Sequence, residues 1–136
     1  MDWKLELVIV PVADQDRAKA FYVDRLGWNL IVDHRAGDEF RVVQVSPPGS
    51  PCEIALMRNP DAAGSVQGLH LVVNDIEAAR SHLLGRGVDV SDFFHFESGS
   101  QVAGLDSERG DYNSYLSFND SEGTGWLVQE VGHAAP

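Results

Sequence analysis

Apolar residues follow two different periods along the first 58 residues of the chain. Runs rich in β-branched residues, which are typical of strands, occupy 5–12, 28–35, 39–46 and 52–58. Between the first two runs, Ala18, Phe21 and Tyr22 recur at three- and four-residue spacing, which predicts a helix over 15–26 with one apolar face. The pattern therefore predicts a strand, a helix and three further strands.

The same order restarts in the second half of the chain. Residues 59–67, NPDAAGSVQ, are polar and contain Pro and Gly, so we interpret them as a linker. Beyond the linker we expect a helix over 76–85 and strands over 68–73, 88–96, 112–118 and 126–131. The polar stretch 97–111 predicts a long loop, which we interpret as a lid over a binding site.

An internal repeat relates the two halves. Asp14 and Asp75 stand 61 residues apart, and each precedes a predicted helix, where its carboxylate can accept hydrogen bonds from the first free backbone N–H groups. We therefore predict an α+β fold in which a single domain contains two βαβββ modules. The modules are 1–58 and 68–136.

Composition narrows the class of protein. The chain has 136 residues, of which 43% are hydrophobic, and this fits one globular domain. Ten Lys and Arg against 21 Asp and Glu give a formal net charge of −11, which argues against binding to nucleic-acid phosphates or to an anionic membrane surface. Cys52 is the one cysteine, so no internal disulfide can form. Since no signal-peptide or membrane-span pattern is found, we expect a cytoplasmic protein.

Three stretches of the chain resemble the signatures of one family. They are PVADQDRAKAFYVDRLGWNL in the first half, and VVNDIEAARSHLLGRGVDV and SFNDSEGTGWLVQE in the second half. They resemble the vicinal oxygen chelate (VOC) superfamily, which comprises glyoxalase I, the bleomycin-resistance proteins and the extradiol dioxygenases. The resemblance implies that the two modules form a cupped, eight-stranded mixed sheet with the helices on its outer face. It also implies a homodimer, because members of this family commonly pair modules between chains.

The resemblance further implies where a metal ion would lie. The metal enzymes of the family use one ligand from the first and one from the fourth strand of each module. The matching positions in this chain are Leu7, Ala55, Gly68 and Gln129. Three of these residues have no side-chain donor, whereas a divalent ion needs three or four ligands, so we expect no metal or other cofactor and no glyoxalase I activity. A shift of two residues brings up Glu53 and His70, which leaves a displaced metal site as an alternative.

Strand side chains alternate between faces, so each matched position predicts its neighbours in the cup. The resulting lining is mostly apolar with a few polar groups, as in small-molecule pockets. Phe94 and Phe96 share one strand face, which predicts an aromatic wall for a flat ligand, and Tyr115 is expected to join them. The predicted ligand-binding residues are Leu7, Ile9, Glu53, Ala55, Met57, Gly68, His70, Phe94, Phe96, Tyr115 and Gln129.

These patterns favour a metal-independent small-molecule-binding protein of the bleomycin-resistance type. It would hold an apolar or aromatic ligand, and the acidic charge suits a cationic one. The alternative is a metal-free isomerase, lyase or cyclase in which His70 is the catalytic acid/base and Gln129 or a tyrosine stabilises an oxyanion. The sequence leaves open whether the chain is an enzyme, since no HExxH, CxxC, GxGxxG or GxSxG motif occurs.

Overall fold

The computed structural model describes residues 1–133, which form two compact units. The first unit comprises Met1–Val66 together with Asp120–Thr124, and the second comprises Gln67–Asn119 and the residues from Gly125 onward. Each unit contains a mixed sheet and a helical segment, in the order βαβββ in the first unit and with one additional strand, β7, in the second, so the predicted α+β class and the two modules are confirmed. The strands are hydrogen-bonded in two sheets, of four and five strands, which is one strand more than predicted.

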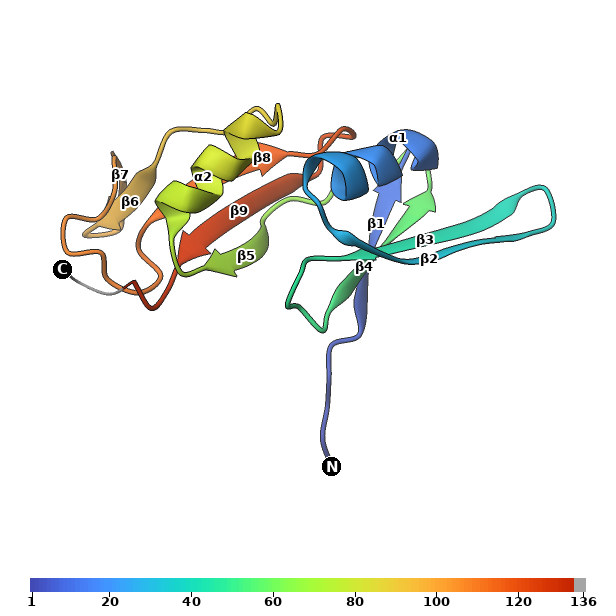
Figure 1. Cartoon of the computed structure of the whole chain (residues 1–136), viewed down its shortest axis with the longest axis horizontal. Helices are drawn as coiled ribbons and strands as arrows, with labels where there is room; N and C mark the ends of the chain where they lie inside the picture. Colours follow the sequence, from blue (N-terminus) through green and yellow to red (C-terminus); the bar gives the residue numbers. More distant parts are fainter. Residues whose placement is uncertain (134–136) are drawn as a thin grey trace. The chain divides into compact units, whose positions relative to one another are not determined.

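The first sheet has the strand order β1-β4-β3-β2 (Figure 1). β1 and β4 run parallel, and the other neighbouring pairs are antiparallel. The strands are β1 (Leu7–Val12), β2 (Asn29–Ala36), β3 (Phe40–Ser46) and β4 (Glu53–Arg58). Each begins and ends within two residues of its predicted range, because the apolar periodicity is clear throughout this half.

A helical segment connects β1 to β2. α1 (Gln15–Ala20) begins after Asp14, whose carboxylate accepts from a first-turn backbone N–H at 3.1 Å. It continues directly into η1 (Phe21–Arg25), a π-helical turn. Gly27, with a φ of 75°, follows the segment in the left-handed conformation that commonly ends a helix. The helix predicted over 15–26 is therefore confirmed, with a wider last turn.

α1 and η1 cover one face of the first sheet and form the core of the unit there. Alternate side chains of β1 show which face this is, because Val10 and Val12 are fully buried whereas Ile9 is 62% exposed. The buried apolar side chains of this unit are Val10, Val12, Ala18, Phe21, Tyr22, Leu26, Trp28, Val43, Val45, Ile54, Ala55 and Leu56.

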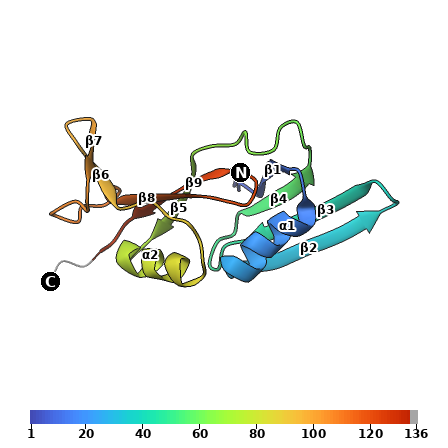
Figure 2. The ribbon, with the colours of Figure 1, turned by 90° about the horizontal axis from the view of Figure 1, so that it is seen from above.

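The second sheet has the strand order β5-β9-β8-β6-β7, with β5 parallel to β9 and the other pairs antiparallel. Its strands are β5 (Leu69–Val73), β6 (Phe94–Glu97), β7 (Ser100–Ala103), β8 (Tyr115–Asn119) and β9 (Gly125–Glu130). α2 (Ile76–Gly85) lies on one face of this sheet (Figure 2). Asp75 caps it, accepting from the Ala78 N–H at 3.0 Å, as Asp14 caps α1.

The core of the second unit lies between α2 and the sheet. Its buried apolar side chains are Ile76, Leu83, Val88, Leu116, Phe118, Trp126 and Val128. Phe118 and Trp126 stack with their ring centroids 6.3 Å apart. Within residues 1–133, neither module has a helix of the length and apolarity that crossing a membrane requires.

The predicted strand 88–96 is too long. Only its last residues pair continuously, from Phe94 onward, and Val90 makes a single bridge to Phe118. Between them the Ser91 hydroxyl accepts from a backbone N–H of β8, so a side chain takes the place of a strand partner. The strand predicted over 112–118 likewise begins later, as β8.

The predicted loop 97–111 contains one strand of the sheet, β7. It pairs with β6 through a two-residue turn formed by Ser98 and Gly99. Both turn residues have positive φ, of 51° and 81°, which matches the twist of two-residue hairpins. The prediction missed this hairpin because SQVA has no apolar periodicity, although the Ser-Gly pair is a turn signal.

Candidate functional site

The face of the first sheet that α1 does not cover is here termed the first open face. β1 and β4 are in register, with Leu7 opposite Glu53 and Ile9 opposite Ala55. Residues that lie opposite each other in a sheet point to the same face, so each strand contributes alternate side chains to it. The predicted residues of the first module therefore lie on this one face: Leu7, Ile9, Glu53, Ala55 and Met57.

The face of the second sheet opposite α2 is here termed the second open face. The strand register aligns one row of residues across the whole sheet: Ala103, Phe94, Tyr115, Gln129 and Val72. The neighbouring row contains Ser117, Leu127 and His70. The structure therefore brings four predicted residues of the second module together, Phe94, Tyr115, Gln129 and His70, and Phe96 follows Phe94 on the same face. Gly68 directly precedes β5.

Phe94, Phe96 and Tyr115 form an aromatic cluster on the second open face. The rings of Phe94 and Tyr115 stack with centroids 5.5 Å apart and 12° between their planes, and Phe96 meets both edge-on. The Tyr115 hydroxyl donates to the Tyr112 carbonyl at 2.6 Å, which fixes the end of the ring. Phe96 is 40% exposed, so the cluster offers an aromatic surface to a ligand.

Glu53 is the carboxylate among the predicted residues of the first open face. Its Oε1 is buried and has no hydrogen-bond partner within residues 1–133. Together with its neighbours it lines an open hollow of about 770 Å³, formed by Lys4, Leu5, Glu6, Pro51, Cys52 and Glu53. A buried acceptor without a partner is unfavourable, so Glu53 is a candidate to accept a hydrogen bond from a ligand N–H or O–H group.

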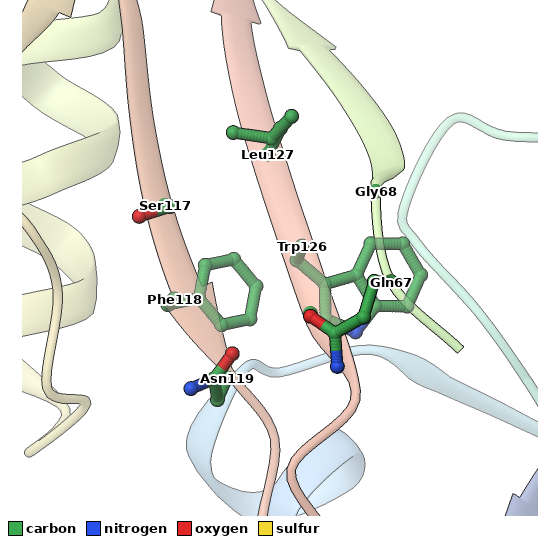
Figure 3. A pocket seen from close by; sticks show the side chains of 8 residues that line it. Gln67, Gly68, Ser117, Phe118, Asn119, Trp126 and Leu127 are labelled. Carbon is green, nitrogen blue, oxygen red and sulfur yellow. The ribbon is translucent and has the colours of Figure 1, made fainter. Parts of the chain in front are cut away.

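A smaller hollow of about 290 Å³ lies in the second unit, where β5 and β9 begin (Figure 3). It is lined by Gln67, Gly68, Ser117, Phe118, Asn119, Gly125, Trp126 and Leu127. The Gln67 amide lies where a β-carbon on Gly125 would be, so this glycine leaves room for it. Of the lining residues the sequence predicted only Gly68, because Gln67 and Gly68 are distant in sequence from the β8 and β9 residues that they meet here, and no local pattern marks such a contact.

Comparison with known proteins places the chain in a family. The family model described as Glyoxalase/Bleomycin resistance protein/Dioxygenase superfamily matches residues 4–128. The chain belongs to this superfamily. Among curated proteins, the uncharacterized protein YetH of Bacillus subtilis (strain 168) is 24% identical to it over 123 residues, which is 90% of this chain and 94% of YetH.

Solved superfamily structures resemble the chain over almost its whole length. TnmS3, an antibiotic binding protein from Streptomyces sp. CB03234, is 29% identical with a TM-score of 0.73, over 95% of this chain and 96% of TnmS3. A glyoxalase/bleomycin resistance protein from the same Streptomyces strain is also 29% identical, with a TM-score of 0.67, over 93% and 100% of the two chains. A superfamily member from Sphaerobacter thermophilus DSM 20745 shares the fold at 24% identity, with a TM-score of 0.71, over 96% and 98%.

The metal ion of the superfamily's metal enzymes does not fit the residues at the matched positions. Leu7, Ala55 and Gly68 have no side-chain N, O or S donor. Gln129 has an amide, but the register places it opposite Val72, about 13 Å along the strand from Gly68. Within residues 1–133, no three His, Cys, Asp or Glu side chains come together as metal ligands, so the displaced site gains no support.

His70 is exposed on the second open face and lies opposite Leu127. Its Nδ1 lies 2.6 Å from the Gly68 carbonyl oxygen, so in the neutral ring Nδ1 carries the proton and Nε2 has the free lone pair. The ring can therefore accept a proton through Nε2 from a group on this face. Tyr115 is less suited to stabilise an oxyanion, because its hydroxyl already donates to the Tyr112 carbonyl.

Proposed function

We propose that this chain is a metal-independent small-molecule-binding protein that holds an apolar or aromatic ligand on its second open face. The observation that carries the proposal is the aromatic cluster of Phe94, Phe96 and Tyr115. The two rows of residues described above for the second open face contain no Asp, Glu, Lys or Arg. Rings that already hold each other in place lose little freedom when a flat ligand stacks on them. The 29% identity with TnmS3, an antibiotic binding protein, supports the same class of function.

Polar groups around the aromatic cluster would orient the ligand. Gln129 lies opposite Tyr115 in the strand register, and His70 lies in the next row. A few such groups in an apolar surface are typical of small-molecule sites. The first open face is a separate candidate surface, on which Glu53 would accept a hydrogen bond from an N–H of a bound molecule, between the apolar side chains of Leu7, Ile9, Ala55 and Met57. The net charge of −11 favours a cationic ligand over an anionic one.

We further propose that the protein is a homodimer. The large apolar side chains that are more than half exposed include three in the first unit: Trp3 (87%), Leu5 (69%) and Ile9 (62%). Groups of exposed apolar side chains mark interaction surfaces more often than plain monomer surface. Native mass spectrometry is expected to show a dimer for the wild type and a monomer for a variant with both Trp3→Ser and Leu5→Ser. A monomeric wild type at micromolar concentration would contradict the proposal.

A planar aromatic cation tests the ligand class. 9-Aminoacridine is flat, cationic and fluorescent, and 1-aminoadamantane is a cation of compact, non-planar shape. We expect a fluorescence titration to give saturable binding of 9-aminoacridine, and we expect 1-aminoadamantane not to displace it. Displacement by 1-aminoadamantane at equal concentration would show that charge and not stacking determines binding.

Phe96→Ala tests the aromatic cluster itself. We expect it to weaken 9-aminoacridine binding about tenfold, because an aromatic pair contributes roughly 0.5–1.5 kcal/mol beyond the apolar area that it buries. Phe93→Ala is the matched control, since Phe93 directly precedes β6 and packs against the Arg80 guanidinium, which lies 5.4 Å from its ring centroid. The control should bind like the wild type. Unchanged affinity for 9-aminoacridine in Phe96→Ala would contradict the proposed binding site.

A metal-free isomerase, lyase or cyclase is the second candidate function. It is favoured by the Nδ1 contact of His70, which leaves Nε2 as a proton acceptor on the open face. Wild type and His70→Ala can be incubated with carbonyl compounds in D₂O and their products analysed by mass spectrometry for deuterium at acidic C–H positions. Deuterium uptake that His70→Ala loses, with 9-aminoacridine affinity kept, would support the enzyme. No uptake by the wild type would support the binding protein.

A further inference from the structure

The segment 105–114 is held against the end of β9 by several hydrogen bonds. The Tyr112 N–H donates to the Glu130 carbonyl at 2.8 Å, and the Glu130 N–H donates to the Ser114 carbonyl at 3.1 Å. Beyond the strand, the Gly132 N–H donates to the Asp111 carboxylate at 2.8 Å. These contacts indicate that this part of the predicted lid is held beside the sheet.

A buried ion pair anchors the same segment. The Arg109 guanidinium donates to both carboxylate oxygens of Glu130, with Nε to Oε1 at 2.8 Å and Nη2 to Oε2 at 2.7 Å. Glu130 is fully buried, and its Oε2 also accepts from the Ile76 N–H at the start of α2 at 2.9 Å. The Arg109 guanidinium also binds the Glu77 carboxylate of α2 at 2.9 Å, and its Nη2 lies 3.4 Å from Nδ1 of His133. The hydrogen bonds from Arg109 lower the pKa of Glu130, against the effect of burial, so the pair is charged near neutral pH.

Two residues of the segment have a backbone conformation that side chains disfavour. Arg109 has a φ of 51° and Tyr112 a φ of 60°. Tyr112 is a bulky residue, and in this region its β-carbon crowds the backbone. Such a conformation persists only when surrounding contacts hold it, and here those contacts are the ion pair and the hydrogen bonds to Glu130.

The segment also contacts the aromatic cluster directly. The Tyr112 carbonyl accepts from the Tyr115 hydroxyl at 2.6 Å. One residue further, the Asn113 side chain accepts from the Phe96 N–H at 3.1 Å and donates to the Phe96 carbonyl at 3.2 Å. Tyr112 and Asn113 therefore hold the Tyr115 hydroxyl and the Phe96 backbone, respectively.

We propose that Arg109 is a positioning residue for the ligand face, because its ion pair with Glu130 holds Tyr112 in the left-handed conformation and thereby fixes the Tyr115 hydroxyl. The consequence for affinity rests on the proposed function, whereas the coupling between Arg109 and Tyr112 does not. Arg109 has no contact with the aromatic cluster itself within residues 1–133, and it acts through Glu130, Tyr112 and Asn113. Loss of the ion pair lets Tyr112 relax to negative φ, which moves its carbonyl away from Tyr115.

Amide exchange measures the coupling without any ligand. We expect Arg109→Met to reduce the hydrogen-exchange protection of the Tyr112 amide at least tenfold, since that N–H donates to Glu130 only while the segment is held. Arg109→Lys keeps the positive charge but cannot bind both carboxylate oxygens of Glu130 in the same bidentate way, so we expect an intermediate loss of protection. Arg80→Met is the matched control, because Arg80 binds the Ser91 carbonyl and Asp92 in the same unit. It should leave the Tyr112 amide protected.

Affinity for 9-aminoacridine measures the consequence. Arg109→Met and Tyr115→Phe should each weaken binding about tenfold, and the double variant should be no weaker than either single variant, because both changes break one chain of contacts. Arg80→Met should bind like the wild type. Unchanged Tyr112 protection in Arg109→Met, or effects of Arg109→Met and Tyr115→Phe that multiply, would overturn the proposal. If the wild type binds no 9-aminoacridine, the proposed function fails, and amide exchange alone decides the role of Arg109.

Discussion

Three glycines differ in what a β-carbon would meet at their positions. Gly64 has a φ of 80°, and its β-carbon would lie 2.6 Å from the Glu122 carbonyl oxygen. Gly27 has a similar φ of 75°, but nothing lies within 4 Å of the β-carbon position. At Gly125 the β-carbon would meet only the end of the flexible Gln67 side chain. Substitutions at the three sites can therefore distinguish the cost of a strained backbone conformation from the cost of steric crowding.

Alanine substitutions at these glycines should destabilise the protein to different extents. We expect Gly64→Ala to lower the free energy of unfolding by about 3 kcal/mol, since left-handed strain and a clash with backbone add. Gly27→Ala should cost about 1 kcal/mol, from strain alone, and Gly125→Ala less than that, because Gln67 can turn away. Urea denaturation of the three variants measures the order. A larger loss for Gly27→Ala than for Gly64→Ala would contradict the role of the Glu122 contact.

Single residues were predictable where the sequence determines a local hydrogen bond. Asp14 and Asp75 cap their helices as expected, because a short acidic side chain before a helix reaches the first-turn N–H groups without help from the rest of the fold. The partners of Tyr115 and Arg109 were not predictable, since the Tyr112 carbonyl and the buried Glu130 carboxylate reach them only through the path of the 105–114 segment.

At the scale of the element, the β6–β7 hairpin contains a buried histidine. His95 is 6% exposed, with its Nδ1 2.6 Å from the Gly104 carbonyl and its Nε2 3.0 Å from the Glu97 carboxylate. Both partners are acceptors, so the doubly protonated ring satisfies both of them. The hydrogen bonds to Glu97 and then Gly104 raise the pKa of His95 above its usual value, with a smaller contribution from Asp106.

The stability of the protein should therefore fall as the pH rises above neutral. A group with a higher pKa in the folded than in the unfolded chain contributes stability that is fully present below the unfolded value, about 6.5. This stability is lost as the pH rises through the folded value. We expect the urea midpoint of the wild type to decrease between pH 6 and pH 9, and His95→Gln to remove that part of the decrease. The same slope in His95→Gln would assign the effect to other groups.

The strands of the two modules differed in how well they could be predicted. In the first module, runs of apolar and β-branched residues mark β1 to β4, including β2, in which no residue is buried. In the second module β7 is the edge strand, and Ser100, Gln101 and Ala103 are all exposed. Unlike β2, which is also an edge strand, β7 has no run of apolar residues, so only the turn at Ser98 and Gly99 could have indicated it.

At the scale of the whole molecule, the turn Asp120–Thr124 connects β8 to β9 but packs in the first unit. The hydroxyl of Tyr22, a fully buried residue, donates to the Asp120 carboxylate at 2.6 Å. Glu122 binds the Arg17 guanidinium at 2.8 Å and accepts from the Ala13 N–H at 2.8 Å. A turn from the second repeat therefore completes the hydrogen bonds of the first.

Tyr22→Phe should reveal how much this turn contributes. We expect a loss of about 1–3 kcal/mol in the free energy of unfolding, because one oxygen of the buried Asp120 carboxylate loses its donor. Asp92→Asn is the control and should cost less, since the Asp92 side chain is fully exposed and water replaces its contact with Arg80. Thermal unfolding followed by circular dichroism measures both. A loss in Tyr22→Phe no greater than in Asp92→Asn would contradict a structural role for the buried bond.

The repeat itself was visible in the sequence, because the strand and helix patterns recur with capping aspartates 61 residues apart. The membership of the turn Asp120–Thr124 in the first unit was not visible. It depends on pairs such as Tyr22 with Asp120, which lie 98 residues apart in the chain, and no local periodicity reports such a contact.

This turn bears on how the duplicated chain can be divided. A fragment ending at residue 66 would contain every strand and helix of the first repeat but would lack Asp120 and Glu122. The hydroxyl of Tyr22 and the N–H of Ala13 would then lose these carboxylate acceptors, and the complementary fragment would contain the two carboxylates without these donors. Separately expressed halves should therefore need each other to fold fully. A duplication that began with two equal copies would by this exchange have made each half depend on the other.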